Sequence, residues 1–370
     1  MQIKFIGPDR PFSDIPTATM DECLSYCRDR SVLGVDTETS GLDFTKEKLL
    51  MLQIGDRDLQ FVIDVRYVDI SVLTPILESE HILKIFQNVK FDYKFILNEG
   101  IVLENVYDTM LVEKILYCGY PDVRVSLADI CRRRLNVTLN KEVRNSFIGM
   151  TGEPFTDHQI LYGADDIKHL FDIRDLQLEE IKKEKLEKVM QLENYASLAF
   201  ADIEYNGLIV NREEWLAISK EEKILLVQAE KEMDDLIYND PIFEKVIPKE
   251  VQGDLFQAPR RVNVKWSSPM QSLKVLQQVI PELSNVNGKE IYVHRTRHKL
   301  IGMYIRYKEK AKVVTSYGSG FLDLVFSDGL IHTSFDQILN TGRVSSKKPK
   351  HIGPYDREVI SKSDEFRETL

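Results

Sequence analysis

Two acidic residues of the sequence lie two positions apart in one predicted strand. Asp36 and Glu38 end the run Ser31–Glu38, whose short, apolar and β-branched composition predicts a strand. Because side chains alternate along a strand, both carboxylates point to the same face. A third acid, Asp92, falls in the first turn of a predicted helix. These positions suit a site that binds cations.

A tyrosine and a fourth acid complete the set. Tyr162 and Asp166 are four apart, so they lie one turn from each other on a predicted helix. Four converging carboxylates repel one another unless cations lie among them, and hard oxygen ligands suit Mg²⁺ or Mn²⁺. Two such ions can hydrolyse a phosphodiester, because one activates water and both stabilise the developing charge. The Tyr162 hydroxyl could orient that water, although a phenol with the ordinary pKa of about 10 is a poor base.

Each feature alone has a simpler interpretation. Asp36 and Glu38 could form a solvated strand edge, and Asp92 an ordinary acid favoured by the helix dipole. Tyr162 and Asp166 could be a partly buried pair on a helix face. Only their occurrence in one chain favours a metal site.

The elements that must position these residues are predicted as α/β. Strands are expected at 31–38, 49–55, 59–64 and 82–86, with a hairpin turn at 55–58. Helices are expected at 89–98, 108–117, 126–135 and 157–186. This order favours a mixed sheet with flanking helices. Further helices are expected at 189–205, 212–238, from Pro269, and at 298–313, with a loop or small insert at 239–268.

Three segments resemble the exonuclease motifs of the DEDD superfamily. They are DTETSGL at 36–42, QNVKFD at 87–92 and YGADD at 162–166. The tyrosine four residues before the last aspartate resembles the DEDDy branch, which includes the proofreading domain of family A DNA polymerases and ribonuclease D. The resemblance implies a ribonuclease H-like 3′→5′ exonuclease domain over residues 1–187.

The resemblance also assigns roles to residues. It implies that Asp36, Glu38 and Asp166 hold the first of two Mg²⁺ or Mn²⁺ ions, that Asp36 bridges to the second, and that Asp92 acts through water ligands. Tyr162 completes the catalytic set. Leu42 corresponds to an apolar residue that wedges against the terminal base, with a core leucine as the alternative interpretation. The other implied contacts to substrate in these motifs are Thr37, Asn88 and Phe91.

The second half resembles the thumb of family A DNA polymerases. WSSPMQ at 266–271, a basic helix at 298–316 and TGRVSS at 341–346 carry this likeness. It implies a mainly helical, thumb-like region at 188–346. A solvated face is the alternative for the basic helix, but its position between an exonuclease-like domain and TGRVSS favours phosphate contact. The implied DNA contacts are Lys308, Lys312, Arg343 and Ser345.

Residues 347–370 resemble the start of a polymerase palm, and no palm or fingers motif follows. We therefore expect a 3′→5′ DNA exonuclease that does not polymerise alone. It is expected to be part of a split polymerase, with a separate polypeptide carrying palm and fingers as a partner, or of a truncated one. The alternatives are a ribonuclease D-like RNA exonuclease and a non-catalytic subunit that holds DNA.

Charge and composition are compatible with this interpretation. The net charge is −10, yet residues 294–350 hold 11 Lys/Arg and 4 Asp/Glu, a local net of +7, and a basic tract can follow phosphates on an acidic chain. The sequence shows no signal peptide and no membrane span, which favours a cytoplasmic protein. The four cysteines lack zinc spacing, and the pair at 23 and 27 is typical of one buried helix face.

Overall fold

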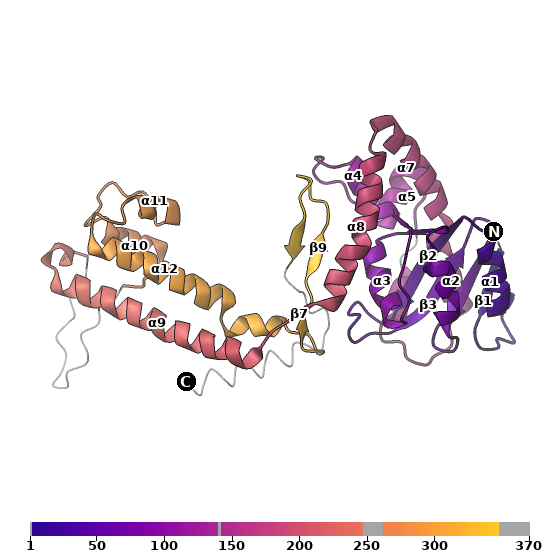
Figure 1. Ribbon diagram of the computed structural model, residues 1–370, viewed down its shortest axis with the longest axis horizontal. Coiled ribbons are helices and arrows are strands. Elements are labelled where there is room, and N and C mark those ends of the chain that lie inside the picture. Colours follow the sequence, from indigo (N-terminus) through magenta and orange to yellow (C-terminus); the bar gives the residue numbers. More distant parts are fainter. Residues whose placement is uncertain (1, 140–141, 247–261, 263, 348–370) are drawn as a thin grey trace. The chain divides into compact units, whose positions relative to one another are not determined.

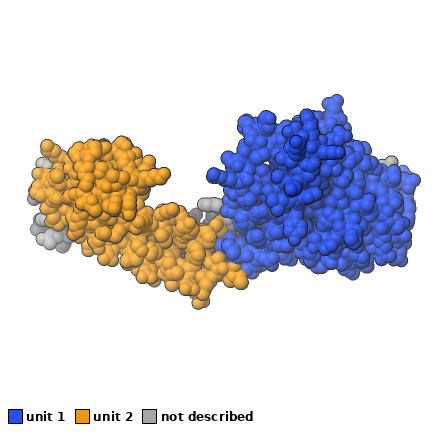
Figure 2. All heavy atoms as spheres, turned by 45° about the horizontal axis from the view of Figure 1, so that its top comes forward, with its two compact units in different colours: residues 1–208, 326–370 blue, residues 209–325 orange. Residues whose placement is uncertain are grey.

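The computed structural model describes residues 2–139, 142–246, 262 and 264–347. The chain forms two compact units (Figure 2). The first comprises residues 1–208 and 326–370, and the second comprises residues 209–325. The described residues contain no helix that is both long and apolar enough to cross a membrane.

The first unit is built on a six-stranded mixed sheet (Figure 1). Its order is β1-β4-β3-β2-β5-β6, in which β3 runs antiparallel to β2 and β4 and the other neighbours are parallel. The strands are β1 Gln2–Ile6, β2 Val32–Thr39, β3 Leu49–Gly55, β4 Leu59–Asp64, β5 Leu83–Phe86 and β6 Val106–Asp108. The four predicted strands and the mixed sheet are confirmed. The short edge strands β1 and β6 were not predicted.

Helices cover both faces of this sheet. The α-helices of the first unit are α1 Met20–Arg28, α2 Thr74–Leu77, α3 Val89–Asn98, α4 Thr109–Leu116, α5 Leu127–Leu135, α6 Asp157–Lys168, α7 Leu170–Glu184 and α8 Glu187–Asn206, with 3₁₀ turns η1 Ile70–Leu73 and η2 Glu142–Phe147. One core cluster joins the sheet to α1, α2 and α3 and includes the buried thiols Cys23 and Cys27, as expected. A second cluster joins the opposite face to α6 through residues such as Met51 and Ala164.

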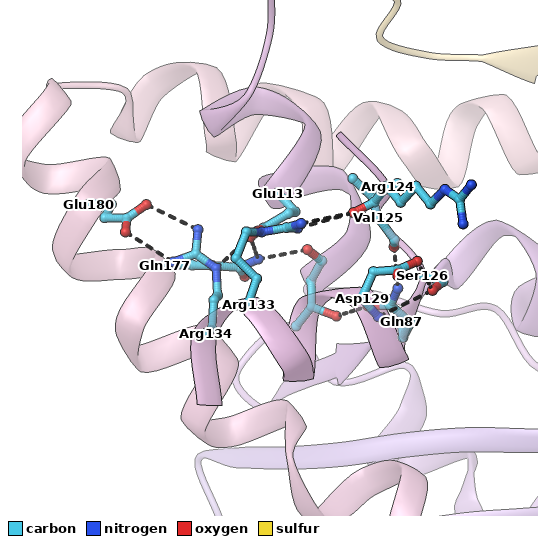
Figure 3. A network of polar contacts seen from close by, with 11 residues as sticks. Gln87, Glu113, Arg124, Val125, Ser126, Asp129, Arg133, Arg134, Gln177 and Glu180 are labelled. Atoms are coloured by element: carbon cyan, nitrogen blue, oxygen red, sulfur yellow. Dashed lines mark hydrogen bonds and ion pairs between the residues drawn. The ribbon is translucent and has the colours of Figure 1, made fainter. Parts of the chain in front are cut away.

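The single helix predicted at 157–186 is two helices, because the chain breaks at His169. The break sends α7 towards α4 and α5. There the fully buried Glu113 of α4 accepts hydrogen bonds from Arg133 and Arg134 of α5, at 2.7 and 2.6 Å, and from Gln177 of α7, at 2.8 Å (Figure 3). The contact with Glu113 of α4 stabilises the position of α7. The periodicity of residues 157–186 cannot reveal this contact, because Glu113 lies far away in the sequence.

The second unit is a small helical body. It contains α9 Arg212–Asn239, α10 Pro269–Leu276, α11 Gly288–Val293, α12 Lys299–Tyr317 and the turns η3 Pro241–Phe243 and η4 Ser319–Leu324. Its core packs Met233 of α9 and Leu300 and Tyr304 of α12 around Trp266. Pro269 opens α10, as predicted. Most of the insert predicted at 239–268 lies outside the described residues.

The compact units differ from the predicted domain bounds of 1–187 and 188–346. Helix α8 packs on α3, α4 and α7, so the first unit continues to residue 208. The chain returns to this unit after residue 325, where Gln337 Nε2 donates to the Glu193 carbonyl of α8 at 2.7 Å. The remaining strands are β7 Leu208–Ile209, β8 Leu330–Ile331, β9 Ser334–Asp336 and β10 Ser345–Lys347. The palm-like start predicted at 347–370 lies, after Lys347, outside the described residues.

Candidate active site

Three of the predicted carboxylates meet in the first unit. Asp36 and Glu38 of β2 and Asp166 of α6 each offer one carboxylate oxygen, and these oxygens lie within 4.8 Å of one another. Glu38 is buried, and the other two are half-buried. Three hard, anionic oxygen donors at this spacing fit Mg²⁺ or Mn²⁺.

Two glycines let α6 approach the sheet closely enough to bring Asp166 to the strand. A Cβ on Gly163 of α6 would lie 2.3 Å from Gln53 Nε2, and a Cβ on Gly34 of β2 would lie 2.4 Å from Ile167 Cγ2. Neither position has room for a side chain without displacing its neighbour. A capping box between Thr156 and residue 159 fixes where α6 begins.

Asp92 lies outside this group of three. It is in the first turn of α3, as predicted, and is 3% exposed. Its Oδ1 accepts a hydrogen bond from Thr37 Oγ1 at 2.5 Å, and Thr37 alternates with Asp36 and Glu38 along β2. Burial raises the pKa of Asp92 above its ordinary value, and the Thr37 bond opposes that rise. The role of Asp92 as a metal ligand therefore stays a prediction.

Asp108 is a positioning residue that the sequence analysis did not single out. Its buried carboxylate accepts the N–H groups of Asn88 and Val89, at 2.9 and 3.0 Å, and so fixes the start of α3. It also accepts those of Met110 and Leu111, at 2.9 and 3.2 Å, and caps α4. Burial raises its pKa, while these backbone bonds lower it. The available signal was an aspartate at the start of the helix predicted at 108–117.

Tyr162 is half-buried on α6, one turn before Asp166. Its ring centroid lies 6.3 Å from that of Phe147. The predicted one-turn spacing on a helix is confirmed. The part that Tyr162 plays in hydrolysis stays a prediction.

The predicted substrate contacts of the exonuclease motifs lie in varied surroundings. Leu42 is 48% exposed, which excludes the core alternative. Asn88 has a left-handed backbone with φ of 70° at the start of α3. Phe91 packs on Phe95, with ring centroids 5.2 Å apart. Thr37 directs its hydroxyl to Asp92.

The predicted DNA contacts of the second half fall in different units. Lys308 and Lys312 are exposed on α12 of the second unit, whereas Lys310 of the same helix pairs with Glu222 at 2.7 Å. Arg343 is exposed and Ser345 half-buried near the β9–β10 hairpin of the first unit. A single predicted thumb region thus contributes to two compact bodies.

The family model for the 3′-5′ exonuclease of the DNA polymerase A family matches residues 16–182. This segment contains Asp36, Glu38, Asp92, Tyr162 and Asp166. Residues 16–182 therefore form a 3′-5′ exonuclease domain of the DNA polymerase A family type. Its core therefore has the ribonuclease H-like fold that the motifs implied.

Relatives extend the likeness beyond this domain. DNA polymerase I of Borreliella burgdorferi is 24% identical over 351 residues, covering 89% of this chain and 36% of the relative. Ribonuclease D of Bartonella henselae is 24% identical over 172 residues, covering 46% of this chain and 41% of the relative. The chain thus spans about a third of the length of the polymerase.

Among solved structures, the POL domain of Pol1 from M. smegmatis, in complex with DNA primer-template and dNTP, has a TM-score of 0.62. It is 18% identical, and the match covers 95% of this chain and 55% of that one. At this identity the likeness concerns the fold. It includes the helical second unit as well as the exonuclease domain.

Proposed function

We propose that this chain is a metal-dependent exonuclease that removes nucleotides from the 3′ ends of DNA and proofreads for a family A polymerase. The group formed by Asp36, Glu38 and Asp166 within the 3′-5′ exonuclease segment carries the proposal. Three carboxylates so close together are stable when divalent cations neutralise them. Catalysis by bound ions explains their convergence.

We assign a separate role in hydrolysis to each of these acidic residues and to Tyr162. Asp36, Glu38 and Asp166 would hold the first of two Mg²⁺ or Mn²⁺ ions, Asp36 would also help to hold the second, and Asp92 would act through water ligands. The bound ions supply an activated water and stabilise the charge on the leaving oxygen. The Tyr162 hydroxyl orients the attacking water.

The protein's own surface holds the DNA strand. Leu42, with about half its surface exposed, packs against the terminal base. Asn88 and Phe91, in or beside the first turn of α3, contact the terminal nucleotide. Each of these contacts is testable by single substitution.

One observation favours DNA over RNA as the substrate, and exposed cations favour a nucleic acid in general. The similarity to DNA polymerase I covers 89% of the chain, whereas that to ribonuclease D covers 46%. Lys308 and Lys312 are exposed on α12, so their charges are available to phosphates. Arg343 adds a third exposed cation in the other unit.

The test of the activity uses purified full chain and 5′-labelled oligonucleotides. With Mg²⁺ we expect single-stranded DNA to shorten stepwise from its 3′ end, and a chelator to stop the reaction. Asp36→Ala should abolish hydrolysis, because it removes a metal ligand. Asp165→Ala is the matched control: this neighbouring acid pairs with Lys168 at 3.4 Å and lies outside the group of three, so activity should persist.

The same assay separates the alternatives. Hydrolysis of RNA but not DNA would favour the ribonuclease D-like function. No hydrolysis with either metal, together with duplex binding that weakens steeply with salt, would favour a DNA-holding subunit. Full activity of the Asp36→Ala chain would contradict the site itself.

A further inference from the structure

Two glutamines are buried in the sheet without hydrogen-bond partners. Gln53 of β3 and Gln60 of β4 are both 0% exposed. Within the part of the chain that the structure describes, neither the Nε2 nor the Oε1 atom of either side chain has a hydrogen-bond partner. A buried amide that forms no hydrogen bond destabilises a fold, so its presence needs a reason.

Gln53 lies beside the group of three carboxylates. In the β2–β3 register its Cα is the direct partner of Asp36. Directly opposed side chains of an antiparallel pair share a face, with Cβ atoms about 4.5–5.5 Å apart. On the helix side, the close approach of its Nε2 to Gly163 places the amide against the turn of α6 between Tyr162 and Asp166.

Gln60 provides an internal comparison. Its Cα partners are Gly55 of β3 and Ile3 of β1, and neither of them is one of the three carboxylates that would bind the metal. It shares the burial and the unpartnered amide of Gln53 but not the neighbourhood of the site. A change in stability or in Mn²⁺ affinity that comes only from replacing a buried amide should therefore appear when either glutamine is substituted.

We propose that Gln53 is a positioning residue that orients the Asp36 carboxylate when a divalent cation is bound. With the cation bound, its Nε2–H group would donate to an oxygen of the Asp36 carboxylate. The inference rests on the proposed metal site. Hydrogen bonds of this kind, behind the ligands themselves, fix ligand orientation and strengthen metal binding.

The chemistry of the amide suits this place. A lysine would bring a positive charge that repels the ion, and an apolar side chain would offer the Asp36 carboxylate no hydrogen bond. A neutral amide donates a hydrogen bond without changing the charge of the site. A buried amide without a hydrogen bond lowers the stability of the fold, and its role in holding a metal ligand would offset this cost, as expected where stability is exchanged for function.

The experiment compares the full wild-type chain with Gln53→Met and Gln60→Met, all stripped of metal with a chelator. Thermal unfolding without metal should occur about 2–4 °C higher in both variants, because an apolar side chain of similar size replaces an unpartnered amide. Calorimetric titration with Mn²⁺, without DNA, should show affinity at least about tenfold weaker for Gln53→Met only. Gln60→Met should stay within about twofold of wild type.

The outcomes separate the two proposals. If wild type binds Mn²⁺ and Gln53→Met binds it equally well, the positioning role is overturned while the proposed function stands. If wild type neither binds Mn²⁺ nor hydrolyses DNA, the proposed function fails. A Gln53→Met chain that loses its helical circular dichroism, or unfolds below wild type, also overturns the inference, because the amide would then serve the fold.

Discussion

Replacing Glu204 by leucine should strongly destabilise the first unit. Glu204 of α8 is 1% exposed and pairs with Lys90 and, at 2.8 Å, with Lys94. Both lysines belong to α3, the helix that carries Asp92. The Glu204 carboxylate also accepts the N–H of Phe335 in β9 at 2.7 Å. One carboxylate thus fastens α3 and the returning chain to α8.

The magnitude follows from what the substitution leaves behind. Removing one partner of a buried ion pair costs about 3–5 kcal/mol, because the opposite charge stays buried without compensation. Here two lysines and one backbone N–H lose the carboxylate, and Lys90 Nζ keeps its hydrogen bond to the Phe335 carbonyl at 2.6 Å. For a unit of this size, about 2–4 °C of melting temperature corresponds to each kcal/mol, so a fall of about 6–20 °C is expected.

The assay is thermal unfolding followed by circular dichroism at neutral pH. Glu187→Leu is the matched control, since Glu187 is an exposed residue at the start of the same helix, and its change should stay within about 0.5 kcal/mol. A triple variant, in which Glu204→Leu is combined with Lys90→Met and Lys94→Met, should regain most of the lost stability. It removes all three charges together, and a buried ion network can be replaced by apolar residues at little cost.

Two results would refute this reasoning. A loss below about 1 kcal/mol in the Glu204→Leu chain would show that the network contributes no more than a surface contact. A triple variant less stable than Glu204→Leu alone would show that the lysines serve another stabilising contact. Either outcome would show that unpaired buried charge does not cause the loss of stability at this contact.

Three further predictions concern the site and its support. Tyr162→Phe should lower kcat about 100-fold and leave KM and Mn²⁺ affinity nearly unchanged, since it removes only the hydroxyl that orients water; a large change in KM in steady-state kinetics would argue for substrate binding instead. Gly163→Ala should destabilise by about 1–3 kcal/mol in denaturant unfolding, because its Cβ meets Gln53, whereas Gly302→Ala, at a helix position whose nearest atom is 3.9 Å away, should stabilise slightly. Burial raises the pKa of Glu204, but Lys94 and Lys90 outweigh it and hold the pKa below its ordinary value. The stability from Glu204 is therefore present above about pH 4.3 and lost as the pH falls through the lowered pKa, so the melting temperatures of wild type and Glu204→Leu should converge below about pH 4; a constant difference down to pH 3 would contradict this.

Local periodicity accounts for much of what the sequence predicted. The strands at 49–55 and 59–64 and the helix at 89–98 have the predicted bounds. Alternation along a single strand puts Asp36 and Glu38 on one face. The geometry of a single helix puts Tyr162 and Asp166 one turn apart. Such patterns depend only on residues that are close in the sequence, so they can be predicted without knowledge of the tertiary structure.

The sequence by itself determined the carboxylate and tyrosine motifs, and with them the exonuclease domain. The resemblance already grouped Asp166 with Asp36 and Glu38, and the structure brings these three carboxylates together. Only the tertiary structure decided that Asp92 bonds to Thr37. It also decided that the glutamine opposite Asp36 is buried without a partner, and that α8 and the returning chain belong to the first unit. These outcomes depend on contacts between residues far apart in the chain, and no local period encodes such contacts.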